Sequence, residues 1–430
     1  MSWKVPISGA GQTSNQRRRG FVLVAVTYAA VLVGVTLPSP LYGIYQVEYG
    51  LSTAQVTALF ATYPAVVLVV LAFTGTWSDA LGRRACLLIA VLTSMASSVA
   101  FLLAESPQLL FVGRAFTGVA SGLVVASANA ALIDLEPYHR KGLGSLASST
   151  INQVGLGVGA LAAGLAADHL SAPTRTAYAA HVVIVALALV ALAFVPETAP
   201  RTTTFSVRPT APTLPIEHRA ALFAASAAGF AAFAFCGLVA ALAPFFVWHV
   251  AGADHHTEAG AAVFTLFVMS AVSQAGWSRI EPNVVTRRAL ITFVVSLAGF
   301  VAGVAAATSW AFFAALCLAG VGVGGVFMGS LQTANGLGDP DHRSGVVMTY
   351  FLATFAGLII PVVGAGWLID HSGLRTAAVT FGTLLSLVCA CCLVGERACQ
   401  MVCVWPRCHT LRFPMRVGSL RRSRHDEHDH

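Results

Sequence analysis

One arginine lies deep inside a long apolar stretch of this chain, where a charged side chain needs a chemical reason to be. Arg114 is the only formally charged residue so placed. A buried cation costs several kcal/mol unless it is paired or faces water. We therefore expect Arg114 to hold an anionic substrate group or to tune proton transfer. The alternative is that it binds backbone carbonyls or reaches the outer surface, since it lies only a few residues into its helix.

Groups that could carry a proton are few. No Asp or Glu lies in the middle of an apolar run. The simplest coupling device is a carboxylate that loads and releases a proton in a cavity poor in water. We expect such a role at Asp134 near the inner mouth or at Glu48 near the outer mouth. His181 is a third candidate, although a lone helical histidine is more often simply hydrogen-bonded.

Uncharged polar residues inside apolar runs are the expected substrate contacts. For each one, the alternative is a hydrogen bond between helices, which is worth about 1 kcal/mol. Phenylalanines concentrated between Phe230 and Phe246 suit an aromatic-lined pocket for hydrophobic cargo, and the alternative is that they face the lipid. The polar candidates are Tyr28, Asn129, Asn152, Gln153, Gln332 and Tyr350.

The elements that must position these residues are membrane helices. The 430 residues are 57% hydrophobic and 10% charged, whereas soluble domains carry about 25% charged residues. A helix that crosses a bilayer needs about 20 mostly apolar residues. Twelve such runs lie near 21–43, 54–76, 85–104, 109–133, 143–167, 176–196, 220–248, 259–278, 289–307, 310–335, 345–369 and 375–395.

Basic residues indicate how these spans are oriented. With a cytoplasmic N-terminus, all 25 Lys and Arg except Arg114, Arg175 and Arg375 fall on the inner side. The positive-inside rule then places a multi-pass protein in the cytoplasmic membrane with both termini inside. The net charge of +7 is spread over loops that flank the membrane, so we expect no nucleic-acid partner.

The two halves of the chain repeat each other. Gly164-x3-Asp168-His169 matches Gly366-x3-Asp370-His371, and Trp77-Ser78 matches Trp277-Ser278. A parallel repeat places the substrate between the halves near mid-membrane. We expect an all-α membrane protein with twelve transmembrane helices in two parallel six-helix bundles. The predicted parts are a cytoplasmic N-terminus 1–20, a bundle 21–198, a flexible linker 199–218, a bundle 219–396 and a disordered cytoplasmic tail 397–430.

Two motifs carry a family resemblance. The segment Gly75-Thr-Trp-Ser-Asp79-Ala-Leu-Gly82-Arg83-Arg84 resembles the loop 2–3 signature of the major facilitator superfamily. Arg114-x3-Gly118-x3-Gly122 is similar to its arginine-bearing fourth-helix motif. The chain departs from the family pattern at Ala80, where a basic residue is usual, and at Ala160, where the antiporter motif has proline. The nearest look-alikes are bacterial twelve-span drug and metabolite efflux permeases.

The resemblance implies a conformational gate in the loop 2–3 signature. The carboxylate of Asp79 would cap a neighbouring helix and pair with arginines while the cytoplasmic side is closed. The alternative is an ordinary solvated loop. The second half has Arg279 at the position of Asp79, so only the first half can use this device. The residues of the expected gate are Gly75, Asp79, Gly82, Arg83 and Arg84.

These observations together predict a secondary transporter, a monomer without cofactors, that exports a small amphiphilic compound or metabolite by proton-coupled alternating access. An importer of a sugar or organic anion, and a membrane sensor or scaffold that does not transport, remain as alternatives. No Gly-x4-Gly-Lys-(Ser/Thr) motif is present, which argues against ATP as the energy source. The sequence shows no combination of a nucleophile and a general base that would indicate an enzyme. The Cys and His residues of the tail do not match a zinc module, so we expect no metal site.

Overall fold

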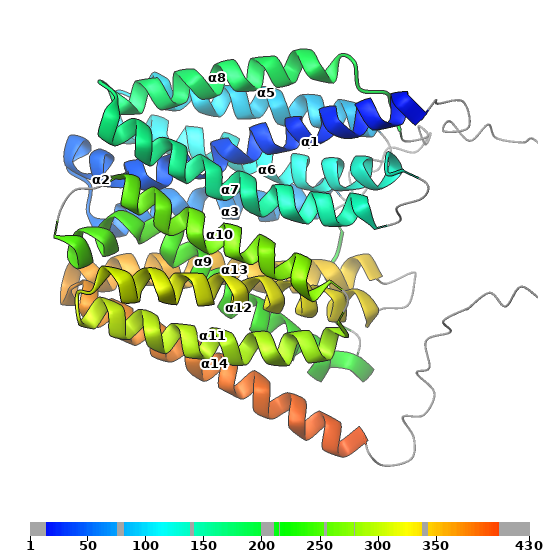
Figure 1. Cartoon of the computed structure of the whole chain (residues 1–430), viewed down its shortest axis with the longest axis vertical. Coiled ribbons are helices and arrows are strands. Elements are labelled where there is room, and N and C mark those ends of the chain that lie inside the picture. The colour runs from blue at the N-terminus through cyan, green and yellow to red at the C-terminus, as the bar shows by residue number, and fades with distance from the viewer. Residues whose placement is uncertain are drawn as a thin grey trace, which may run out of the picture.

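The computed structural model describes residues 14–74, 81–137, 142–198, 210–214, 216–252, 256–278, 280–337 and 343–403. Within these ranges the chain forms helices and no strands. Twelve helical stretches are long and apolar enough to cross a membrane, and they run roughly side by side (Figure 1). The predicted all-α fold with twelve spans is therefore confirmed.

The first half begins with a broken span. Helices α1 and α2 meet at Leu37 and together make one span of 36 residues. Pro38 and Pro40 have no backbone N–H, so two carbonyls of the preceding turn lose their usual helical donors. The helices of this half are α1 (Ser14–Thr36), α2 (Pro38–Tyr49), α3 (Thr53–Thr74), α5 (Arg83–Leu102), α6 (Pro107–Asp134), α7 (Leu143–His169) and α8 (Pro173–Leu192).

The second half ends in a helix that is longer than expected. Helix α14 continues to Cys403, so residues 397–403 are helical rather than part of a disordered tail. Neither Gly nor Pro occurs between 397 and 403 to end the helix. The helices of this half are α9 (Arg219–Ala251), α10 (His256–Trp277), α11 (Pro282–Ala305), α12 (Ser309–Gly336), α13 (Arg343–Ser372) and α14 (Leu374–Cys403), preceded by the 3₁₀ turn η1 (Ile216–His218).

The bundle has two ends, which we name by the helices found there. The terminal end is where α1 begins and α14 ends, on the right in Figure 1. The opposite end holds the junctions between α2 and α3 and between α13 and α14.

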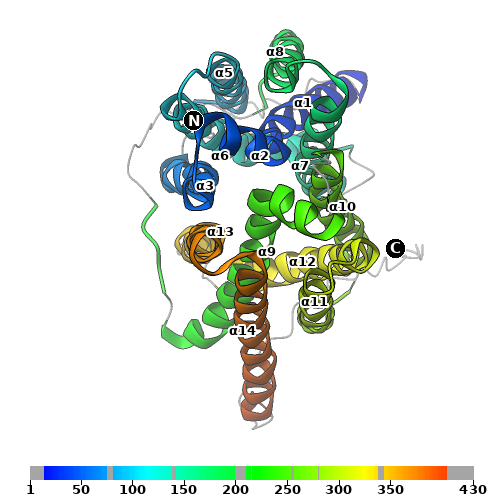
Figure 2. The same ribbon diagram turned by 90° about the vertical axis from the view of Figure 1, so that its left-hand side faces the viewer.

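The helices divide into two groups that face each other (Figure 2). Helices α1 to α8 pack mainly on one another, and so do α9 to α14. Across the interface, α7 packs on α10 and α3 packs on α13. At the opposite end α2 also contacts α9 and α10. The four helices of the two main contacts occupy corresponding places in the sequence repeat.

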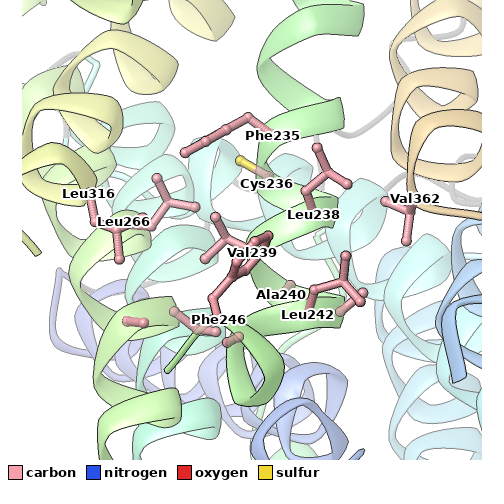
Figure 3. Close-up of a cluster of buried hydrophobic side chains, with 14 of the residues drawn as sticks. Phe235, Cys236, Leu238, Val239, Ala240, Leu242, Phe246, Leu266, Leu316 and Val362 are labelled. Carbon is pink, nitrogen blue, oxygen red and sulfur yellow. The ribbon is translucent and has the colours of Figure 1, made fainter. Parts of the chain in front are cut away.

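The largest apolar core is built around the middle of α9. Phe235, Leu238 and Leu242 project from this helix toward its neighbours (Figure 3). The ring of Phe235 packs edge-on against Phe293 of α11, with ring centroids 5.6 Å apart. Leu266, Leu316 and Val362 bring α10, α12 and α13 to the same cluster. Burial of these side chains fixes α9 in the centre of the second half.

Part of the predicted linker is docked against both halves. The N–H of Thr210 donates to the carbonyl of Ala72 in α3 at 2.7 Å. Thr213 donates its N–H to Gly345 at 3.1 Å and accepts a bond from the Thr349 hydroxyl at 2.9 Å. Residues 210–214 therefore run between the terminal ends of α3 and α13, whereas residues 199–209 and 215 lie outside the described ranges.

Candidate functional site

Arg114 lies in the first half, about two turns from the start of α6, and its side chain is 0% exposed. One Nη atom donates to the carbonyl of Val35 at 2.8 Å, and the other donates to the hydroxyl of Tyr42. Both acceptors come from the broken first span, so the guanidinium joins α6 to the junction of α1 and α2. Arg114 therefore binds a backbone carbonyl, as the alternative to a substrate role supposed.

Aromatic rings surround the rest of the guanidinium. Its Cζ atom lies 5.3 Å from the ring centroid of Tyr42, 5.9 Å from that of Phe60 and 5.4 Å from that of Tyr63. Such contacts stabilise a desolvated cation by about 2 kcal/mol. No carboxylate of the described residues forms an ion pair with Arg114, and its Nε atom has no hydrogen-bond partner there. The cation therefore keeps one donor that an anion could use.

His181 lies in α8 and is enclosed by two other helices of the first half. Its Nε2 atom is 2.9 Å from the carbonyl of Ala30, and its Nδ1 atom is 2.6 Å from the hydroxyl of Ser98. Because a carbonyl only accepts, Nε2 carries the proton and Nδ1 accepts from Ser98. The neutral ring is fully hydrogen-bonded, and this arrangement favours the structural alternative over a proton carrier.

Asp134 and Arg83 form an ion pair at the terminal end of the first half, with Nε 2.6 Å from Oδ2. The carboxylate is 33% exposed, so water can reach it. Arg17 also binds this corner, because its Nη2 donates to the carbonyl of Asp134 at 2.6 Å. Glu48, the third proton candidate, is exposed near the end of α2 at the opposite end of the molecule.

The gate residues lie partly within the described chain. Gly75 and Asp79 fall outside the described residues. Gly82 precedes α5 with φ = +92°, and an added Cβ there would meet the carboxylate of Glu197 at 2.5 Å. Glu197 accepts the N–H of Arg83 at 2.9 Å and that of Arg84 at 3.3 Å. Glu197 therefore caps α5, a role that sequence reasoning missed although the residue follows the sixth span.

The uncharged polar candidates do not share one set of contacts. Gln153 donates to Ser270 at 2.5 Å across the interface between the halves. Tyr350 is buried in the second half and hydrogen-bonds to Ser330 at 2.8 Å, while Tyr28 is buried in the first half. The remaining candidates are half-buried or exposed, namely Asn152, Asn129 and Gln332.

Two aspartates join the halves at the opposite end, and we call them the carboxylate clamps. Asp168, at the end of α7, accepts the N–H groups of His256 at 3.1 Å and Thr257 at 2.7 Å, the first residues of α10. Asp370, near the end of α13, accepts those of Thr53 at 3.0 Å and Ala54 at 2.9 Å, the first residues of α3. A carboxylate at a helix N-terminus satisfies free donors and interacts favourably with the helix dipole.

A glycine one turn before each clamp permits the close approach. A Cβ on Gly164 would overlap the carbonyl of His256, and one on Gly366 would overlap the hydroxyl of Thr57. The repeated Gly-x3-Asp pattern was the sequence signal for this pair. Its meaning was missed because the two N-termini that it caps lie far away in the chain.

A large cavity lies inside the second half, at the terminal end. Its volume is about 1310 Å³, and it is lined by side chains of α9, α11, α12, α13 and α14 together with Leu214. It is therefore not the space between the two halves. Among the described residues, no group of three or more His, Cys, Asp or Glu side chains could hold a metal ion.

A family model described as Major Facilitator Superfamily matches residues 24–362. The chain belongs to the major facilitator superfamily. As a member, it is a multi-pass membrane protein of a transporter family, and the resemblance predicted from the loop 2–3 signature and Arg114 is confirmed at the level of the superfamily.

Relatives within the superfamily are distant. A stretch of 111 residues is 24% identical to the quinolone resistance protein NorA of Staphylococcus aureus, and it covers 26% of this chain and 29% of NorA. The human organic anion transporter MFSD10 (TETRAN) superposes with a TM-score of 0.59 at 16% identity, over 87% of this chain and 99% of that one.

A bacterial homologue of the human lysosomal transporter Spinster, in an inward-facing and unoccupied conformation, gives a TM-score of 0.64 at 15% identity. That match covers 90% of this chain and 98% of the homologue. At such identities these two structures establish that the superfamily fold is shared, and nothing about the cargo.

Proposed function

We propose that this transporter works by alternating access and exports a small amphiphilic compound in exchange for protons. The observation that carries the proposal is the pair of carboxylate clamps, Asp168 on α10 and Asp370 on α3. Alternating access requires contacts between the halves that hold one end closed and break when that end opens. The clamps have this property, because each aspartate and the helix whose N–H groups donate to it belong to different halves.

The basic residues support a cytoplasmic position for the terminal end. Arg17, Arg83 and Arg84 lie there in the first half, and Arg219 and Arg288 lie there in the second. The positive-inside rule then puts both termini in the cytoplasm and the clamps on the outer side. With the clamps formed, the chain is closed to the outside. The neighbour related to Spinster, described as inward-facing, is consistent with this reading.

The packing of the central helices supports the same state. Among the described helices, α1, α6 and α12 make at most marginal contact with the other half. By contrast α2, which continues the first span toward the outer side, packs on both α9 and α10. Besides the main contacts of α7 with α10 and of α3 with α13, the halves thus meet through α2 near the outer side, while α1, α6 and α12 stay apart across the interface. This arrangement would admit a substrate from the cytoplasm.

The strength of the clamps suits a reversible gate. Both aspartates are exposed, so water competes for them, and each hydrogen bond contributes on the order of 0.5–1.5 kcal/mol. Four such bonds together amount to a few kcal/mol. Conformers of a working transporter differ by a similar amount, so that binding of a ligand or a proton can reverse their order.

We assign the proton site to Asp134. Its carboxylate is paired with Arg83, which begins α5, and it lies at the proposed cytoplasmic end with access to water. Protonation would remove the charge that holds Arg83 and would free the arginine for a new partner. Asp79, three positions after the predicted second span 54–76, is the partner that the family resemblance suggests. Neither His181 nor Glu48 touches the gate in this way.

Three phenylalanines support an apolar or aromatic cargo. Phe233 of α9, Phe327 of α12 and Phe355 of α13 are half-buried and pack together, with centroids 5.4 and 5.6 Å apart. Aromatic surfaces of this kind line sites for flat, hydrophobic ligands. The name of NorA, a quinolone resistance protein, agrees with export of such a compound.

One observation favours a second candidate function, transport of an organic anion. Arg114 has no carboxylate partner among the described residues and keeps a free Nε donor. An anionic group that reached it would be held by a desolvated cation. The structural neighbour MFSD10 is an organic anion transporter, which is consistent with this alternative.

Uptake into inside-out membrane vesicles tests the proposal. We would compare a cationic dye, a quinolone, an organic anion and a sugar, each with and without an imposed proton gradient. Gradient-dependent accumulation of the dye or the quinolone is expected, with its loss in Asp134→Asn. Accumulation of the organic anion alone, lost in Arg114→Ala, would replace efflux of an amphiphile by the second candidate. No transport of any compound by folded protein would contradict both.

A further inference from the structure

The cavity of about 1310 Å³ lies within the second half, outside the space between the halves where a transported substrate is expected. It lies between the first three turns of α9 and the part of α14 from Leu384 to Cys392. Figure 2 shows α14 projecting away from the other helices. Binding pockets for drug-sized ligands span about 300–1,000 Å³, so this cavity is large enough for a long hydrocarbon chain.

Apolar side chains dominate its lining, and several of them are uncovered. Phe223 is 76% exposed, Leu384 is 50% exposed and Leu387 is 60% exposed. Cavities lined in this way do not hold ordered water, since a water needs two to four polar partners. Because these helices cross the membrane, hydrocarbon is the material available to fill the space.

Two polar groups on α9 distinguish this cavity from a featureless apolar groove. Arg219, the first residue of the helix, is exposed on the rim. Ser226 lines the cavity further in, is only 8% exposed, and its hydroxyl has no hydrogen-bond partner among the described residues. The two residues are about 10 Å apart along the helix axis. A buried hydroxyl without a partner costs about 1–3 kcal/mol, so a ligand that supplied an acceptor would be favoured.

We propose that the cavity is a binding site for an anionic phospholipid of the membrane leaflet at the terminal end. One acyl chain fills the space between α9 and α14, and the phosphate binds the guanidinium of Arg219. The hydroxyl of Ser226 donates to an ester carbonyl at the top of the chain. The position of each group follows the order of the lipid itself, with charge at the membrane surface, ester below it and hydrocarbon innermost.

The charge of the rim decides between lipid classes. Arg219 is a permanent cation that extends along apolar surface to reach a headgroup. A net anionic headgroup leaves this charge neutralised, whereas a zwitterionic headgroup brings its own cation to the same place. We therefore expect phosphatidylglycerol to bind in preference to phosphatidylcholine.

Lipid retention by the purified full-length chain tests the site without any transport measurement. Native mass spectrometry in a mild detergent would count phosphatidylglycerol and phosphatidylcholine molecules bound across a titration. We expect one tightly held phosphatidylglycerol, bound at least fivefold more tightly than phosphatidylcholine. Equal retention of the two lipids would overturn the proposal, and so would displacement of the phosphatidylglycerol by a transported compound, which would make the cavity a cargo site.

Matched variants place the lipid in this cavity. Arg219→Gln removes the rim charge and should lower phosphatidylglycerol retention at least fivefold, whereas Arg288→Gln, at the same end but outside the lining, should not. Cys391→Trp fills the cavity from α14 and should also lower retention. Val394→Trp, an exposed position of the same helix outside the lining, is its control. Unchanged retention in Arg219→Gln and Cys391→Trp would overturn the lipid proposal. That result would not contradict alternating access, which the experiment does not measure.

Discussion

Asp370 and Thr53 are separated by 317 positions in the chain, yet the carboxylate of one accepts the backbone N–H of the other at 3.0 Å. The bond completes the start of α3, where Ser52 and Gln55 already cap each other. Asp168 makes the corresponding bonds to α10. The two halves of the transporter are therefore held together by the same device used twice.

Neutralising both clamps should open the end that they close. In Asp168→Asn/Asp370→Asn, each site keeps one uncharged acceptor, and we expect a shift of about 1–3 kcal/mol, or about 5- to 150-fold, toward the outward-open state. Nitroxide labels at Leu170 and Trp310, in a background without reactive native cysteines, would report the distance by pulsed electron paramagnetic resonance. Glu258→Gln, in the first turn of α10, is the matched control. An unchanged distance distribution in the double variant would refute the gate.

A methyl group added at Gly366 should lower the stability of the protein by overpacking. Gly366→Ala would force a Cβ against the hydroxyl of Thr57, and such insertions cost about 1–3 kcal/mol. Gly276→Ala adds the same methyl group where no atom lies within 4 Å. Thermal unfolding of purified protein should show a lower midpoint for Gly366→Ala only. Equal midpoints for the two variants would mean that the helices do not approach as closely as described.

Removing the charge of Asp134 should uncouple transport from protons. In Asp134→Asn the ion pair with Arg83 is lost, and no group at this position can exchange a proton. We expect accumulation driven by a proton gradient to fall at least tenfold, while downhill equilibration of the same compound continues. Glu105→Gln, a carboxylate at the other end of the first half, should behave as the wild type. Retained gradient dependence in Asp134→Asn would move the proton site elsewhere.

Arg114 should matter for stability as well as for transport. Arg114→Ala leaves the carbonyl of Val35 and the hydroxyl of Tyr42 without their buried donor, at a cost of about 1–3 kcal/mol for each group. Arg114→Lys restores the charge but not the two-pronged geometry, so it should recover only part of the loss. Thermal unfolding checks both, with the exposed Arg175→Ala as control. If Arg114→Ala lost transport but unfolded at the wild-type temperature, Arg114 would act only in substrate binding.

The number and positions of the helices long enough to cross a membrane could be predicted because they depend on local composition. Runs such as 109–133 are long and apolar, and the basic pairs Arg83-Arg84 and Arg287-Arg288 precede the runs 85–104 and 289–307. The same reasoning did not predict a helix break that leaves hydropathy unchanged. Pro38 and Pro40 lie inside an apolar run, so the break between α1 and α2 leaves the hydropathy pattern intact.

The contacts of the site could not be predicted, since they depend on which helices become neighbours. Arg114 was recognised as an unusual buried cation, but its partners come from α1, α2 and α3. Asp168 and Asp370 were recognised only as repeated residues near span ends. The helices whose N–H groups they accept begin 88 and 317 positions away, a separation that no periodicity encodes.

The clamps also bear on how a two-part transporter can originate. In a pair of identical six-helix chains related by a two-fold axis, each contact between the partners occurs twice. One aspartate at the end of the fifth helix would then cap the second helix of the partner, and its copy would do the same in return. In the present chain the two contacts correspond in the same way, because Asp168 reaches α10 and Asp370 reaches α3, and these helices are the second members of opposite halves. A single ancestral residue would thus have supplied both closures before the halves were fused, and fusion left each copy free to change without the other.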